Sequence, residues 1–135
     1  MSGPLWDRID LHVEVPPVSF EDWSGNGRPA EESSAPVRGR VGAAHGIQGR
    51  RFTGTGIFLN AQMGPKDIRR ICRIKEPEGD FLEAAMDRLV LSARSLDRIL
   101  KVSRTIADLA GDAEITKAHL MEAVQYRTLD REVTI

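Results

Sequence analysis

An arginine stands close to the start of a predicted helix, in the segment Leu91-Ser92-Ala93-Arg94-Ser95-Leu96. Ser92 suits the N-cap, because its hydroxyl can accept a backbone N–H that is free at a helix start. Arg94 then falls in the first turn, at the positive end of the helix dipole, where a cation costs up to about 1 kcal/mol. A bound anion would reverse that sign, and both a helix N-terminus and a guanidinium bind phosphate. The alternative is a solvated helix arginine paired with a nearby carboxylate.

This segment resembles the sensor-two helix of AAA+ ATPases, in which an arginine in a Ser-x-Arg pattern contacts the nucleotide phosphates. It is most similar to the magnesium-chelatase-like branch and, within that branch, to the ComM/YifB competence family. Three later blocks carry the same resemblance, and a fourth lies at the other end of the chain: residues 105–111, 118–123, 125–131 and 2–16. The resemblance therefore covers most of the chain, and it implies that Arg94 senses the phosphates of ATP.

A second arginine lies in the N-terminal block, in the segment Leu5-Trp6-Asp7-Arg8-Ile9-Asp10. The resemblance implies that Arg8 is an arginine finger, which reaches into the neighbouring subunit of a ring. Its guanidinium would offset the charge that spreads over the transferring γ-phosphoryl group. Without the family, the residues favour a surface arginine paired with Asp7 or Asp10.

Several helices are predicted to position these arginines. Apolar and small residues recur at helical spacing after Ser92, and Gly111 suits the left-handed position that ends such a helix. Further helices are predicted over residues 34–52, 65–74 and 80–90, and a final one runs from a Thr116 cap to about Tyr126. The buried stripe of the helix after Ser92 consists of Leu96, Ile99, Leu100, Ser103, Ile106 and Ala110.

The N-terminal region has a different pattern. Leu11, Val13 and Val15 alternate with polar residues, which is typical of a half-buried strand, and Pro16-Pro17 closes it. A single strand forms no sheet, so it either pairs with something outside this chain or stays unpaired. Residues 19–33 are rich in Gly, Ser and polar residues and are predicted to be a flexible linker.

These elements predict a mainly α fold: a bundle of four to five helices with an N-terminal strand-like arm. The resemblance identifies this arrangement with the C-terminal helical lid of an AAA+ ATPase, preceded by the end of the ATPase core. The expected organisation is a core remnant at residues 1–18 with the finger motif and last strand, a linker at 19–33, and the lid at 34–135.

Motifs for independent catalysis are absent. The sequence holds no Gly-x-x-x-x-Gly-Lys-(Ser/Thr) loop and no apolar strand that ends in an acidic pair. We therefore expect no ATP hydrolysis by this chain alone, and ATP and Mg²⁺ are expected to act only in the full-length protein. His12, His45 and His119 lack metal-ligand spacing, so no metal site is predicted.

The overall composition argues against several other classes of protein. The net charge of −1 argues against a global attraction to nucleic acid, although Lys66, Arg69, Arg70 and Arg73 form one basic cluster. No apolar run approaches the about 20 residues that span a bilayer. Cys72, the single cysteine, is predicted to be a packed core thiol, and the absence of a signal segment favours the cytoplasm.

The resemblance implies a ring-shaped motor, expected to be a hexamer, that acts on DNA in branch migration during recombination or natural competence. Its partners would be the N-terminal and core portions, neighbouring subunits and DNA. The rival hypothesis is a stand-alone helical module that binds nucleic acid or protein without catalysis. A third is an inactive remnant of a gene that lost its motor half.

Overall fold

The structure is a computed structural model that describes residues 5, 8–25 and 31–127. Most of the finger motif before Arg8, residues 26–30 of the expected linker and the tail after Arg127 lie outside the described residues. The expected domain boundaries remain predictions for those parts.

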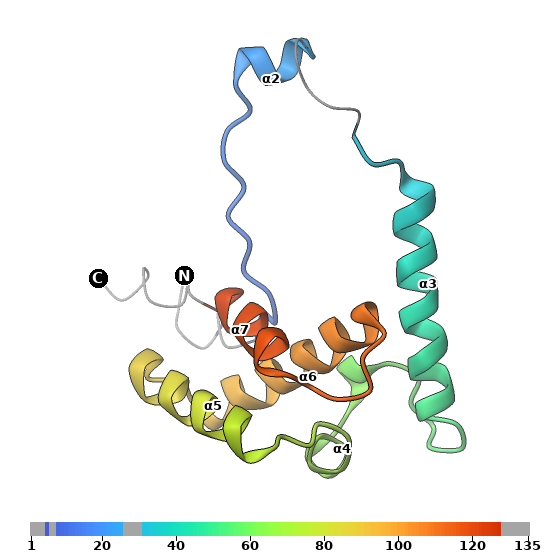
Figure 1. Ribbon diagram of the computed structural model, residues 1–135, viewed down its shortest axis with the longest axis vertical. Coiled ribbons are helices and arrows are strands. Elements are labelled where there is room, and N and C mark those ends of the chain that lie inside the picture. The colour runs from blue at the N-terminus through green and yellow to red at the C-terminus, as the bar shows by residue number, and fades with distance from the viewer. Residues whose placement is uncertain (1–4, 6–7, 26–30, 128–135) are drawn as a thin grey trace.

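Within the described residues, five α-helices form the bundle, and α6 crosses its centre (Figure 1). It packs against α3, α4, the 3-10 helix η1 and α7, and α5 packs against α7. The mainly α fold and its four to five helices are confirmed. Their bounds are Ser34–Arg51 for α3, Asn60–Gln62 for η1, Pro65–Ile71 for α4, Glu76–Leu89 for α5, Ala93–Ala110 for α6 and Lys117–Gln125 for α7.

Both ends of α6 are capped as predicted. The hydroxyl of Ser92 accepts the backbone N–H of Ser95 at 3.2 Å, and Gly111 adopts φ +78° at the C-cap. Ile99, Ser103 and Ala107 are buried along one side. Of the predicted stripe, Ile99 and Ser103 are buried and Leu96, Leu100 and Ile106 are half-buried, whereas Ala110 is exposed and Ala107 is buried instead.

The core joins side chains from every helix of the bundle. Cys72 is buried in it, as predicted, and burial raises the pKa of this thiol to about 11. Its thiol is therefore protonated at neutral pH, which is typical of a structural cysteine. The most enclosed of its larger apolar members are Phe52, Met63, Ile68, Ile99 and Leu120.

The predicted start of one helix is wrong. The sequence placed it at Asp80, but α5 begins at Glu76, four residues earlier. Pro77 and Gly79 disfavour helix interiors, yet proline is well accommodated in the first turn, where its missing N–H has no partner to lose. Similarly, α4 ends at Ile71 rather than Ile74.

The N-terminal arm, residues 9–18, contains no strand in the structure. Its apolar residues are not half-buried either: Val13 is 64% exposed and Val15 80%, whereas His12 is buried. The alternation remains, but no described strand pairs with it, so pairing with something outside this chain and staying unpaired both remain predictions.

The expected linker is partly helical. Residues Phe20–Ser24 form the short helix α2, capped by the Ser19 hydroxyl and by Gly25 at φ +73°. None of its residues is buried, and Figure 1 shows it held away from the bundle beyond the N-terminal end of α3. On α3 itself only Ala44 and Gln48 are buried. Val37 and Val41 stay exposed because the first half of this helix projects past the core.

A buried carboxylate links three elements of the bundle. Asp108 on α6 accepts two hydrogen bonds from Arg51 of α3, at 2.7 and 2.5 Å, and one from Asn60 of η1 at 2.8 Å. Arg104 adds a fourth at 3.1 Å. Burial by itself would raise the pKa of Asp108, but these hydrogen bonds and the two arginine charges outweigh it and leave this pKa below its ordinary value of 3.8.

Asp108→Asn removes the charge that two arginines require and is expected to lower the free energy of unfolding by about 3 kcal/mol. Urea denaturation followed by circular dichroism measures it. Asp87→Asn, at an exposed position on α5, is the matched control and should change little. Equal effects of the two variants would contradict a structural role for the buried cluster.

The same carboxylate predicts a pH dependence. Because its pKa is lower in the folded state, its contribution to stability is complete above the unfolded value and is lost as the pH falls through the folded value. Denaturation midpoints measured from pH 6 down to pH 3 should fall more steeply for the original chain than for Asp108→Asn.

Candidate functional site

The start of α6 presents Arg94 to solvent. Arg94 is exposed in the first helical turn, two residues after the Ser92 cap. It makes no ion pair with any described residue, so the alternative of a paired helix arginine is not seen in that part of the chain. The first turn of α6 holds no acidic residue either. A cation therefore stands uncompensated at the positive end of a helix of 18 residues.

Arg127 brings the N-terminal arm to this end of α6. Its buried guanidinium donates to the carbonyl oxygen of Ile9 at 2.5 Å and to the Ser95 hydroxyl at 3.3 Å. Ile9 directly follows Arg8, and Ser95 directly follows Arg94. One guanidinium therefore contacts the backbone of the residue after Arg8 and the side chain of the residue after Arg94.

Arg8 is exposed and forms no ion pair with another described residue. Its predicted alternative partner Asp10 instead pairs with Arg98 of α6. Asp7 lies outside the described residues. The arm is held further by the backbone N–H of His12, which donates to the Tyr126 carbonyl oxygen at 2.9 Å.

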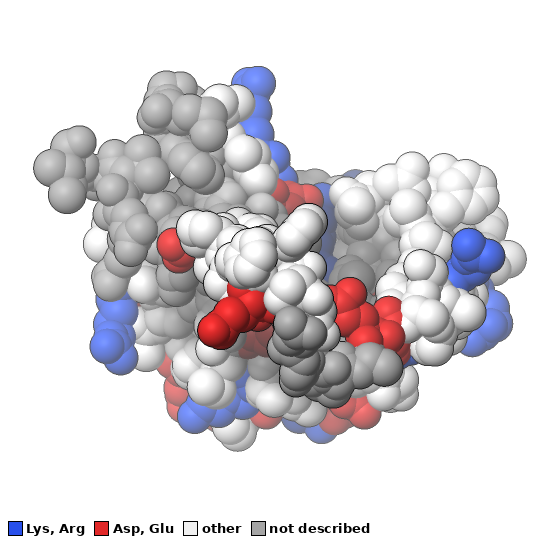
Figure 2. Space-filling view, turned by 90° about the horizontal axis from the view of Figure 1, so that it is seen from above, with Lys and Arg blue, Asp and Glu red and all other residues white. Residues whose placement is uncertain are grey.

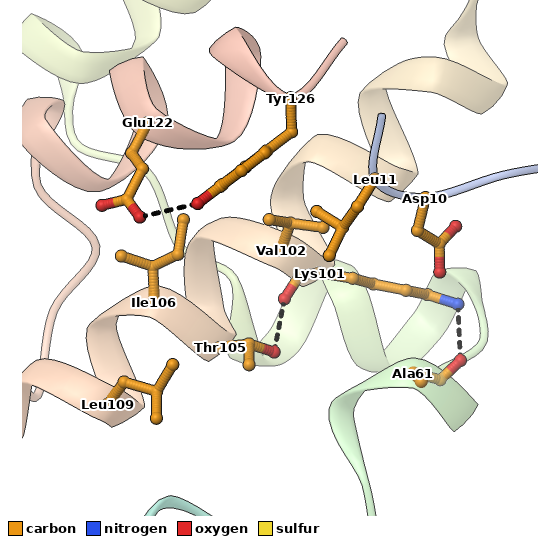
Figure 3. Close-up of a pocket in the computed structure, with 10 residues that line it drawn as sticks. All are labelled: Asp10, Leu11, Ala61, Lys101, Val102, Thr105, Ile106, Leu109, Glu122 and Tyr126. Carbon is orange, nitrogen blue, oxygen red and sulfur yellow. Dashed lines mark hydrogen bonds between the residues drawn. The ribbon is translucent and has the colours of Figure 1, made fainter. Parts of the chain in front are cut away.

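Below this attachment, a groove of about 280 Å³ opens between the arm, α6 and α7 (Figure 3). Its floor is apolar and includes Val102, Ile106 and Leu109. Charged groups stand at its rim: Lys101 donates to the carbonyl oxygen of Ala61 at 3.0 Å, and the Tyr126 hydroxyl contacts Glu122 at 3.4 Å. The groove suits an apolar group rather than a phosphate.

The basic cluster lies on α4 and the turn after it. Lys66, Arg69, Arg70 and Arg73 are all exposed. Arg70 is partly neutralised by Asp67 at 3.1 Å, whereas Lys66, Arg69 and Arg73 make no ion pair with a described residue. The predicted basic face is therefore accessible, although no described aromatic residue interleaves it.

Four buried or half-buried arginines were missed by sequence reasoning: Arg51, Arg98, Arg104 and Arg127. Arg104 donates to the carbonyl oxygens of Asp112 and Ala113 at 2.6 and 2.8 Å, which stabilises the turn after α6. Arg98 and Arg127 hold the arm. Spacing does not separate Arg98 and Arg127 from solvated arginines, because their partners Asp10 and Ile9 lie far away in the sequence.

Two other kinds of site are absent from the described part of the chain. No group of three His, Cys, Asp or Glu side chains there is arranged to hold a metal ion. None of the helices described is long and apolar enough to cross a membrane.

Comparison with known families identifies this arrangement. The family described as "Magnesium chelatase, subunit ChlI C-terminal" matches residues 31–127, which include α3 to α7 and Arg94. The chain belongs to this family. The match begins after the arm, so Arg8 lies outside it.

Relatives extend the magnesium chelatase likeness over nearly the whole chain. "Competence protein ComM" of Haemophilus influenzae is 42% identical over 97% of this chain. The proteins named YifB of Salmonella typhimurium and Escherichia coli are 40% and 41% identical over 97%. The chain spans about a quarter of the length of these curated relatives, 25% in each case. It therefore corresponds to one portion of these longer relatives.

The attachment of the arm predicts a pattern of hydrogen exchange. The amide of His12 should be protected, whereas those of Leu11, Val13 and Val15, which have no partner in the described structure, should exchange freely. Asp10→Asn weakens the pair with Arg98 and should speed exchange at His12 about threefold, as expected for a partly exposed ion pair. Exchange at Ile99, in the core of α6, serves as the control. Protection across residues 11–15 would contradict an unpaired arm.

Proposed function

We propose that this chain is the helical lid of a ring-shaped AAA+ ATPase and that Arg94 contacts the phosphates of ATP bound by that enzyme. The observation that carries the proposal is the exposed Arg94, free of ion pairs with described residues, in the first turn of a well-capped helix. The chain's membership of the magnesium chelatase family supports the proposal.

The site fits the charged part of the nucleotide but not the metal. A guanidinium and the first N–H groups of α6 suit phosphate oxygens. The described residues contain no cluster of Mg²⁺ ligands, so we assign Mg²⁺ and the remaining phosphate contacts to the core of the full-length protein. Without that core, this chain binds and hydrolyses no ATP in our proposal.

In the proposed mechanism α6 transmits the nucleotide state to the bundle. Arg94 is attracted to the triphosphate, and hydrolysis followed by phosphate release weakens that attraction. Because α6 packs against α3, α4 and α7, movement at its first turn displaces these helices together. The lid would then change its angle to the core in each cycle.

Arg8 would act on a different ATP, that of the adjacent subunit in a ring, as an arginine finger. It is exposed, and the Arg127 contact to Ile9 fixes the backbone beside it. Tying this segment to the lid would couple the orientation of the finger to the nucleotide state sensed by Arg94.

We further propose that the complete protein is a cytoplasmic motor, a hexamer, that acts on DNA in branch migration during recombination or natural competence. The name of the Haemophilus relative, a competence protein, supports the process. Its partners would be the N-terminal and core portions, neighbouring subunits and DNA.

Arg94→Ala in the complete protein is expected to lower kcat for ATP hydrolysis about 100-fold, since removal of one preorganised donor to a developing charge has this order of effect. Arg94→Lys should recover part of the rate, because it restores the charge without the forked geometry. Circular dichroism should show an unchanged fold, because Arg94 is exposed. Arg88→Ala, an exposed arginine on α5, is the control. Unchanged turnover in Arg94→Ala would end the sensing role.

A second function rests on a separate observation, the exposed cations Lys66, Arg69 and Arg73. A stand-alone nucleic-acid-binding module would shift duplex or single-stranded DNA at low salt. Replacement of Lys66 and Arg69 by alanine should then weaken binding and reduce its salt dependence by about one unit of slope for each phosphate that is no longer neutralised. Lys117→Ala on α7 is the control. Absence of any shift at low salt excludes this function for the isolated chain.

A further inference from the structure

The helix α2 displays two aromatic side chains that the bundle does not use. Phe20 is 78% exposed and Trp23 76%, and their ring centroids lie 5.8 Å apart. Caps at Ser19 and Gly25 give this short helix a defined shape. An exposed aromatic pair on an ordered projection is typical of an interaction anchor, because aromatic residues bury a large area at little cost in side-chain entropy.

A groove elsewhere on the same chain has the matching character. It lies between α3 and α6, measures about 280 Å³ and is lined mainly by apolar side chains, including Val41, Leu59 and Leu109. No acidic residue lines it. It meets the groove of Figure 3 at Ala61, Thr105 and Leu109, so the two hollows lie on either side of a shared border.

Charge distinguishes the two hollows as partners for α2. The arm and α2, residues 9–25, contain acidic residues, Glu21 and Asp22 among them, but no Lys or Arg. Residues 33–66, which include α3, contain basic residues but no Asp or Glu. Seen from above, acidic atoms lie around the middle of the molecule and basic atoms at its right edge (Figure 2). The hollow of Figure 3 has Glu122, Lys101 and Asp10 on its rim, and Asp10 is paired with Arg98, so this rim offers an acidic helix no net positive charge.

We propose that the groove between α3 and α6 receives the α2 helix of a second copy of this chain. Phe20 and Trp23 would fill the apolar hollow beside Leu109. Glu21 would face the basic side of α3, where Arg38 is exposed one turn before Val41. In the structure α2 stands apart from its own α6, so the pair contacts none of its own core.

Such a contact joins two different surfaces, so it is heterologous and adds copies in one direction. Repetition closes a ring if the rotation between copies permits, and otherwise builds an open series. The inference goes beyond the proposed ATPase role and needs no nucleotide. Its failure would therefore leave the role of Arg94 untouched.

Sedimentation equilibrium of the purified chain tests the contact. The weight-average mass should rise above 15.0 kDa with concentration and pass that of a dimer. A tip variant, Phe20→Ser with Trp23→Ser, and a groove variant, Leu109→Asp, should each weaken association about tenfold or more, as expected for loss of an aromatic anchor. Leu109 is 47% exposed, so its replacement leaves the core intact. Val90→Ser, at an exposed valine outside both surfaces, is the control.

Mixing the two variants gives the sharpest result. The tip variant keeps its groove and the groove variant keeps its tip, so together they should form a one-to-one dimer and nothing larger. A charge exchange tests the orientation: Arg38→Glu should weaken association about threefold, and Glu21→Lys in the partner should restore it. An unchanged mass in either single-surface variant, or no dimer in the mixture, would overturn the proposal.

Two other occupants would also overturn it. A chain that stays at 15.0 kDa at every concentration, with Trp23 fluorescence shifted to the blue, would mean that α2 folds onto its own groove. A monomer whose binding to duplex DNA is abolished in Arg38→Ala would assign the basic side of α3 to nucleic acid.

Discussion

The carboxylate of Asp108 is buried, and a buried charge is tolerated only where opposite charges and hydrogen-bond donors surround it. Arg51 and Asn60 meet this requirement from outside α6, and Arg104 from within it. Since Arg51 is the last residue of α3 and Asn60 begins η1, the pairing sets where both elements meet α6. The basic side of α3 and the groove beside Leu109 take their positions from this contact.

Helix α6 gives the bundle two ends with different environments. Its C-terminal half is enclosed by the Asp108 cluster and by the turn that Arg104 holds. Its first turn is open, and the cation there has no compensating charge within the described structure. A helix fixed at one end and exposed at the other suits a part that responds to an anion and moves its neighbours. Arg127 contacts Ile9 of the arm and Ser95 in the first turn of α6. The residues that follow Arg8 and Arg94 are therefore held by the same guanidinium.

Much of the helical framework was predictable from local signals. Ser92, Gly111 and Thr116 mark helix ends, and the apolar stripe after Ser92 identifies the buried face of α6. The start of α5 was not predictable, because Pro77 is equally compatible with a loop and with a first helical turn. The apolar alternation of the arm predicted a half-buried strand, but the described arm forms no strand and its valines are exposed. Burial of such a segment depends on a pairing partner, and alternation reports only that a partner is needed.

By itself the sequence determined the family, the mainly α class and the position of Arg94 in the first turn of its helix. These depend on neighbours within a few residues, such as a cap, a helical period or a short motif. Only the tertiary structure decided which arginines remain free. Arg94, Arg98, Arg104 and Arg127 have the same side chain, but three of them are committed to partners that include Asp10, Asp108 and Ile9. Arg98 and Arg127 contact residues far away in the sequence, and no local spacing encodes such contacts, whereas Arg104 and Asp108 lie one helical turn apart.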